Sequence, residues 1–265
     1  MKKLVFFAVA FTAMVFASCG NKSVQNTEVK DSVKSFEQEQ IEASIKMHFD
    51  SLAAELSKLK ELPIMAKDGA LVLSAAEKQV KPDFLLNPSI ADEATTLAEK
   101  YRAITALQTD KQIAKMYDMA TDDYDKAIGK LAADINDPSF KVIEDGANLT
   151  DNVEALYNAM NENGRINYFW QIAATSLVEQ LYATSENSDK FMKAFNDDIA
   201  SNSTFRLVLI LDAIDRLKEY DPEIAPVAEA LKPLEVLNAM GVDDMKTQLA
   251  EAKDKIAEAR KAILK

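Results

Sequence analysis

Few residues in this chain could act as nucleophiles, general bases or metal ligands, because it holds one cysteine and one histidine. They are Cys19 and His48, 29 positions apart. A catalytic thiolate usually pairs with a histidine in the folded protein, and helical di-metal sites need two histidines. A glycine-rich phosphate loop and a nucleophile elbow are also missing from the sequence. The sequence therefore predicts no catalytic residue, no metal site and no cofactor.

Carboxylates are the one abundant chemical group, with 43 Asp and Glu against 31 Lys and Arg. A pair of carboxyl groups can serve as acid and base in glycoside hydrolysis. A carboxylate-dependent envelope hydrolase acting on glycans is therefore the alternative function. Three adjacent acid pairs lie near predicted helix starts, where the helix dipole already accounts for them. They are Asp122–Asp123, Asp197–Asp198 and Asp243–Asp244.

The residues before Cys19 form the pattern of a secretory signal. Two lysines follow the initial methionine, and residues 4–17 are apolar apart from Thr12. That run is shorter than the roughly 20 residues that a membrane-spanning helix needs. It matches the apolar region of a signal peptide, and the small residues Ala17 and Ser18 follow at the expected place.

The stretch Phe16-Ala17-Ser18-Cys19 resembles the lipobox of bacterial lipoproteins, although the family prefers Leu where Phe16 stands. The resemblance covers residues 1–19 only. It implies diacylglyceryl transfer to the Cys19 sulfur, removal of residues 1–18 and acylation of the new amino terminus. Two or more acyl chains anchor a protein stably to a membrane. The other interpretation is an ordinary signal peptide, cut near Ala17 or Ser18, that leaves a free thiol.

The resemblance also bears on location and partners. The stretch CGNKSVQN lacks both the Asp that retains some lipoproteins in the inner membrane and the acidic cluster of some surface lipoproteins. We therefore expect a lipid-anchored protein of the bacterial cell envelope, at the outer membrane and facing the periplasm. Without residues 1–18 the formal charge would be −14, which disfavours nucleic acid as a partner because that role needs a basic face.

Composition and spacing predict an all-α fold. Gly and Pro are scarce, at six and seven residues, and apolar residues recur every three or four positions, as on one face of a helix. We expect an irregular multi-helix bundle of about nine or ten helices. A loose helical-repeat arrangement stays open. Thr109 is predicted to cap and restart one helix, and Ser203 to open another.

The chain divides into segments of different character. Residues 19–36 are polar and predict a flexible tether, up to about 50 Å long at 3.3 Å per residue. Residues 37–135 and 150–265 are two helical halves, which we expect to form one continuous domain. The carboxylate-rich break at 136–150 is interpreted as a polar connection between them.

The most aromatic segment, residues 165–183, is apolar on nearly all sides, which predicts a central helix. Core packing accounts for its aromatic residues. Tyr168 and Trp170 are nevertheless candidate ligand-binding residues, since ligand pockets in bundles form between helices. His48 lies at the edge of the first predicted apolar stripe and is interpreted as a packing or surface residue.

Together these patterns predict a membrane-anchored envelope lipoprotein with a non-catalytic helical body. The body would bind a protein partner or a small molecule, and acylated Cys19 would make the membrane contact.

Overall fold

The computed structural model describes residues 36–60, 62–65, 71–142 and 152–265, all of them helical or irregular. This part of the chain holds twelve α-helices, of which three have only four or five residues, and no β-strand. The prediction of an all-α multi-helix bundle is confirmed. Cys19 and the predicted tether up to residue 35 lie outside the described residues.

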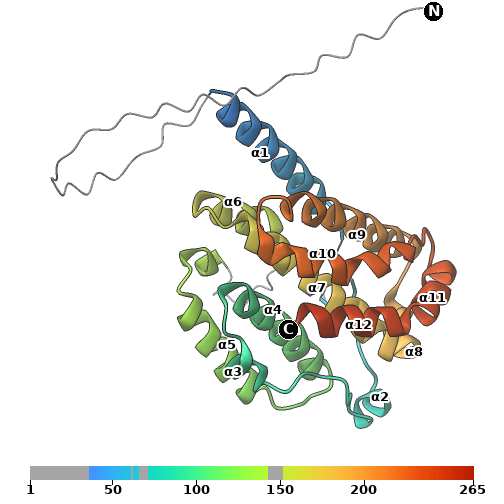
Figure 1. Cartoon of the computed structure of the whole chain (residues 1–265). Coiled ribbons are helices and arrows are strands. Elements are labelled where there is room, and N and C mark those ends of the chain that lie inside the picture. The colour runs from blue at the N-terminus through green and yellow to red at the C-terminus, as the bar shows by residue number, and fades with distance from the viewer. Residues whose placement is uncertain (1–35, 61, 66–70, 143–151) are drawn as a thin grey trace, which may run out of the picture. The chain divides into compact units, whose positions relative to one another are not determined.

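Figure 1 labels the α-helices, and η marks a short 3-10 helix. In order they are α1 (Phe36–Leu56), α2 (Ala75–Gln79), α3 (Ile90–Glu93), α4 (Leu97–Met116), α5 (Asp122–Ile135), η1 (Pro138–Val142), α6 (Val153–Glu162), α7 (Ile166–Glu186), α8 (Ser188–Phe191), η2 (Met192–Ala194), α9 (Asp197–Leu217), η3 (Pro222–Ile224), α10 (Ala225–Leu231), η4 (Lys232–Val236), α11 (Val242–Glu251) and α12 (Lys253–Ile263).

Helix α7 forms the centre of the bundle. It contacts α4, α6, α9, α11 and α12, and Figure 1 shows other helices on several sides of it. Its aromatic residue Trp170 has no exposed surface, as expected for a helix that is apolar on nearly all sides. Its buried polar residues, among them Gln171 and Glu179, need partners on the helices that surround it.

Several helix boundaries have the capping chemistry that their local sequence favours. Thr96 begins α4 with a capping box, in which its hydroxyl accepts from the Glu99 N–H and the Glu99 carboxylate accepts from the Thr96 N–H. Asp221 accepts from the Glu223 N–H at the start of η3. Gly164, with φ of 67°, lies just past the end of α6, in the left-handed conformation that favours glycine.

The predictions for Thr109 and Ser203 were wrong. Helix α4 continues through Thr109, whose hydroxyl donates to the Thr105 carbonyl at 3.2 Å. Helix α9 begins six residues before Ser203, whose hydroxyl donates to the Ile199 carbonyl at 2.8 Å. Both hydroxyls bond back to the carbonyl four residues earlier, an alternative that lets Ser and Thr stay inside a helix.

Residues 42–265 form one compact unit. Helix α5 ends at Ile135, and Asn136 follows with φ of 48°. Residues 143–151 of the predicted connection lie outside the described residues. Within the described part, every helix is too short or too polar to cross a bilayer.

Candidate functional site

A buried ionic cluster surrounds Arg260 on α12. Its guanidinium Nε donates to the Glu179 carboxylate on α7 at 2.8 and 3.0 Å, and Nη2 donates to Asp110 on α4 at 3.3 Å. Nη1 donates to the Phe84 carbonyl at 3.1 Å, and the Tyr182 ring lies 4.2 Å away, in cation–π contact. The cluster therefore links α12, α4, α7 and the segment before α3.

Two buried carboxylates share one cation in this cluster. The pKa of each carboxyl group is raised. Burial raises the pKa of Glu179, and the nearby Asp110 charge raises it further, while Arg260 opposes both effects. Burial likewise raises the pKa of Asp110. Raised carboxyl pKa values occur at catalytic sites, but both side chains here are 1% exposed. We assign the cluster a structural role, because solvent and substrate have no access to it.

Tyr168, a candidate ligand residue, lies in a second cluster. Its ring stacks on that of Tyr101, with centroids 4.7 Å apart. The Tyr101 hydroxyl donates to Asp137 and accepts from the Arg165 guanidinium at 2.7 Å. Burial alone would raise the pKa of Asp137, but the bonds from Tyr101 and from the Ser139 N–H outweigh it and lower that pKa. These contacts join α4, η1 and the start of α7.

Trp170, the other candidate ligand residue, lies in the hydrophobic core. Its ring packs edge-on against Phe169, with centroids 5.1 Å apart, and lies tilted against Phe49 of α1, with centroids 6.2 Å apart. Trp170 and Tyr168 are neighbours in sequence but contribute to different parts of the structure. The structure does not bring them together around one cavity in the described part of the chain.

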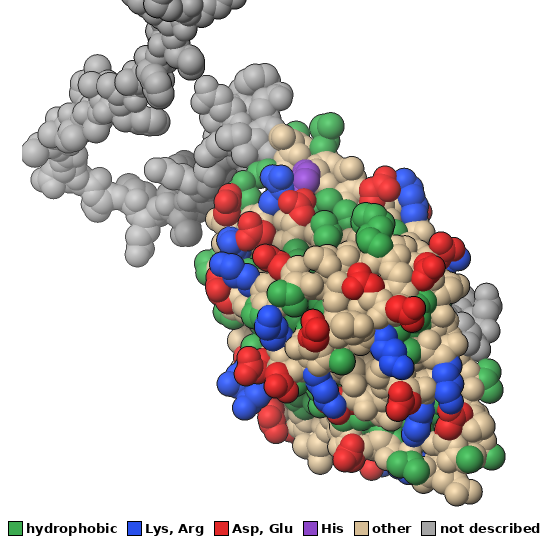
Figure 2. All heavy atoms as spheres, turned by 90° about the vertical axis from the view of Figure 1, so that its right-hand side faces the viewer, with side chains coloured by type: hydrophobic (Ala, Val, Ile, Leu, Met, Phe, Trp, Pro, Cys, Tyr) green, Lys and Arg blue, Asp and Glu red, His purple; other side chains and the backbone are tan. Residues whose placement is uncertain are grey.

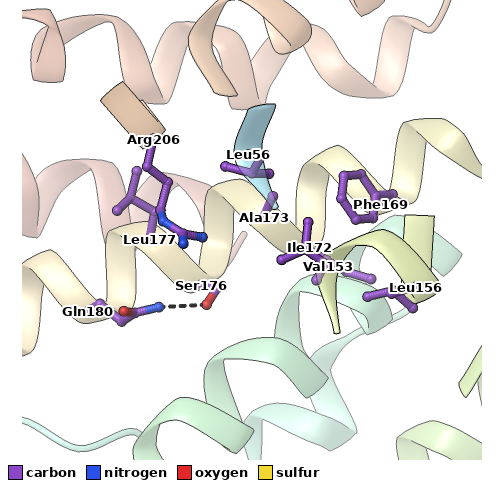
Figure 3. Close-up of a pocket in the computed structure, with 10 residues that line it drawn as sticks. All are labelled: Leu56, Val153, Leu156, Phe169, Ile172, Ala173, Ser176, Leu177, Gln180 and Arg206. Atoms are coloured by element: carbon purple, nitrogen blue, oxygen red, sulfur yellow. Dashed lines mark hydrogen bonds between the residues drawn. The ribbon is translucent and has the colours of Figure 1, made fainter. Parts of the chain in front are cut away.

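A small cavity does border α7 (Figure 3). It measures about 20 Å³, room for one water molecule. Its polar lining includes Ser176 and Gln180, joined by a hydrogen bond of 2.9 Å, and Arg206 from α9. Tyr168 and Trp170 are not among its lining residues. The cavity is too small for an organic ligand.

A larger groove, of about 440 Å³, lies between α1 and the carboxyl end of α9. We call it the α1–α9 groove. Its α1 wall is lined by Ser44, Ile45 and His48, and its α9 wall by Asp212, Asp215, Arg216, Glu219 and Tyr220. Its volume lies within the range of small-molecule sites.

His48 and Asp212 connect the two walls of the groove. His48 Nε2 lies 2.7 Å from Asp212 Oδ2, and Arg216 Nε donates to Asp212 Oδ1 at 3.3 Å. The side chains of His48 and Asp212 are 32% and 40% exposed. Figure 2 shows the histidine at the surface, beside acidic and basic side chains and close to a group of hydrophobic ones. The network holds these three side chains together and links the two walls of the groove.

The chemistry available in the groove favours binding over catalysis. Its three carboxylates all come from the α9 side, and the α1 wall supplies none. A glycosidase places two carboxyl groups on either side of the bond that it breaks. Across the described residues, no three His, Cys, Asp or Glu side chains come close enough to hold a metal ion.

Sequence reasoning missed this groove, although His48 was singled out. Its partner Asp212 is 164 residues away, and no local pattern reports such a contact. The one available signal was the spacing of Asp212 and Asp215, which places two acids on successive turns of one helical face, with Glu219 just past the end of that helix.

Comparisons with protein-family models, with curated proteins and with solved structures gave no match for this chain.

Proposed function

We propose that this protein is a lipid-anchored component of the bacterial cell envelope whose helical body binds a ligand or a protein partner and does not catalyse a reaction. The segment Phe16-Ala17-Ser18-Cys19 carries the proposal, because it combines a lipobox-like pattern with the only cysteine of the chain. Acylation of Cys19 would hold the protein at the outer membrane, with the body in the periplasm.

The helical body supports a binding role. The carboxylates whose pKa is raised, Asp110 and Glu179, are sealed in an ionic cluster. The α1–α9 groove is open, large enough for a small molecule and lined by polar side chains. Its carboxylates lie on one side only, which argues against the alternative of a carboxylate-dependent hydrolase acting on glycans.

Metabolic labelling with a radioactive fatty acid tests the anchor. The full chain, expressed in a Gram-negative host, should take up label and sediment with outer membranes. Cys19→Ser should lose both properties, because the serine hydroxyl does not replace the thiol as the acyl acceptor. Its helical content should not change, since Cys19 precedes the described helices.

A matched control moves the thiol instead of removing it. The double variant C19S/S23C keeps one cysteine but places it after Lys22, outside the small-residue context. It should also remain unlabelled. Label in this control would mean that any thiol near the amino terminus is acylated, and label retained by Cys19→Ser would refute the assignment of Cys19.

A further inference from the structure

Four large apolar side chains are exposed around the middle of α9. They are Phe205, Val208, Val236 and Met240, each between 46% and 57% exposed. The last two follow α10 in the chain but lie beside α9, because η4, which ends at Val236, contacts α9 and the Thr204 hydroxyl donates to the Ala239 carbonyl at 2.6 Å. Scattered apolar residues are normal on a protein surface, whereas a group of them marks an interaction site. We call this group the α9 face.

Two opposite charges flank the apolar residues of α9 at equal distances. Asp198 lies nine residues before Leu207, and Arg216 lies nine residues after it. The 18 residues that separate them make five turns of 3.6 residues, so both side chains leave the helix in the same direction, about 27 Å apart along its axis. Their contacts in the described part of the chain are exposed pairs, with Lys60 3.8 Å from Asp198 and Asp212 3.3 Å from Arg216. Such pairs are weak enough for another charge to compete with them.

The symmetry about Leu207 makes α9 complementary to a second copy of itself. When two α9 helices lie antiparallel with their Leu207 positions level, Asp198 of each copy is level with Arg216 of the other. Phe205 is then level with Leu209 of the second copy, and no charged residue of α9 is level with a like charge. A parallel arrangement would oppose Asp198 to Asp198. Opposite charges that meet in one register fix the orientation of an interface, and a reciprocal contact of this kind is typical of a two-fold symmetric pair.

We propose that the α9 face joins two copies of this chain in an antiparallel, two-fold symmetric pair. Phe205 and Val208 of both copies form its apolar centre, and two Asp198–Arg216 pairs set its register. A different protein would need to supply the same two charges, about 27 Å apart, which a second copy already carries. A contact of about 27 Å by one helix diameter, about 10 Å, is smaller than the roughly 800 Å² per partner of a standard interface. The pair should therefore be weak, with a dissociation constant between about 1 and 100 µM. The inference rests on the binding role proposed above, with a second copy as the partner, and not on acylation of Cys19.

Sedimentation equilibrium of the full chain tests the proposal, in an excess of neutral detergent that is matched to the density of the solvent. The natural chain should pass from monomer to dimer between about 1 and 100 µM. Asp198→Arg and Arg216→Asp should each weaken the dimer at least about tenfold, because each variant opposes like charges at both ends of the contact. The double variant D198R/R216D restores opposite charges at both ends and should return to within about threefold of the natural chain. Phe205→Asp puts a charge into the apolar centre and should also weaken the dimer at least about tenfold.

The control distinguishes this contact from a change in overall charge or from two chains that share a micelle. Asp123 is an equally exposed acid in the first turn of α5, outside the α9 face, and Asp123→Arg changes the net charge as Asp198→Arg does. It should leave the dissociation constant within about twofold of the natural chain. Three results would each overturn the proposal: a natural chain that stays monomeric, equal weakening by the two reversals to arginine, or a double variant as weak as the single ones. Circular dichroism of each variant verifies folding. The fatty-acid labelling of Cys19 does not depend on these results, so the two proposals fail separately.

Discussion

Replacing Arg260 by methionine should cost the folded protein about 3 to 5 kcal/mol at pH 8. The guanidinium lies 2.8 and 3.0 Å from the Glu179 oxygens and 3.3 Å from Asp110, and the two acids are almost fully buried. Methionine fills much of the same space but donates no hydrogen bond. The Glu179 carboxylate and the Phe84 carbonyl then lose the guanidinium, and Asp110 keeps only the bond from the Leu86 N–H, at 2.6 Å. The cost is a large share of the 5 to 15 kcal/mol that is typical of a folded domain.

The loss should depend on pH, and its sign follows from the two carboxylates. Burial raises the folded-state pKa of Glu179 and of Asp110 above the ordinary value, which is about 4. Such groups stabilise the folded state at pH values below their ordinary pKa. This contribution disappears as the pH rises through the folded-state pKa. Removing the Arg260 charge should raise both pKa values further. The deficit of Arg260→Met should therefore be largest at pH 8 and shrink toward pH 5.

Urea unfolding at the two pH values, followed by the fluorescence of Trp170, measures the change in the free energy of unfolding. In thermal unfolding at pH 8, the melting temperature should fall by about 6 to 20 °C, at 2 to 4 °C per kcal/mol. Arg216→Met is the matched control, because Arg216 is 56% exposed and pairs with Asp212 at the surface. It should cost less than about 1 kcal/mol. A loss of similar size in both variants, or a deficit that grows on acidification, would refute the reasoning.

Two further pairs of substitutions test the core and the helix caps. Trp170→Ala should cost about 3 to 5 kcal/mol of the free energy of unfolding. Trp170→Phe should cost clearly less, because the buried indole N–H has no hydrogen-bond partner within the described residues and no hydrogen bond is lost with it. Equal losses in thermal unfolding would contradict this. Thr96→Val removes the hydroxyl that caps α4 and should cost about 1 kcal/mol. Thr109→Val should change the free energy of unfolding by less than about 0.5 kcal/mol, because the Thr109 hydroxyl bonds only to the Thr105 carbonyl inside α4. A reversed order in urea unfolding would contradict the assignment of Thr96 as the cap.

The helical fold could be predicted because its signals are local. The apolar periodicity of residues 165–183 depends on neighbours three and four positions away, and it correctly indicated a helix, observed at Ile166–Glu186, with contacts to α4, α6, α9, α11 and α12. The start of η3 likewise depends on adjacent residues, because Asp221 accepts from the Glu223 N–H and Pro222 follows it. Thr109 and Ser203 misled because a hydroxyl that caps a helix and one that bonds back inside it have the same sequence signature. Whether the helix continues through such a residue depends on how the neighbouring apolar residues pack in the folded protein.

The sites could not be predicted to the same extent, because they depend on contacts between distant segments. The cluster around Arg260 combines four segments, and its contact with Phe84 spans 176 residues. The groove joins His48 to Asp212 across 164 residues. The sequence did indicate that Cys–His chemistry was disfavoured, but it gave no means of placing the histidine beside a carboxylate, an arginine and an exposed tyrosine.

Helix α1 has a consequence for the order in which the chain folds. Its contacts through three consecutive residues reach far ahead in the sequence: His48 to Asp212, Phe49 to Trp170, and Asp50 to the Tyr157 hydroxyl at 2.8 Å. A ribosome makes about 5 to 20 residues each second, so the 164 residues that separate His48 from Asp212 take about 8 to 33 seconds. Helix α1 therefore has its partners on α6 and α7 available first, and its contacts are complete only when α9 has been made.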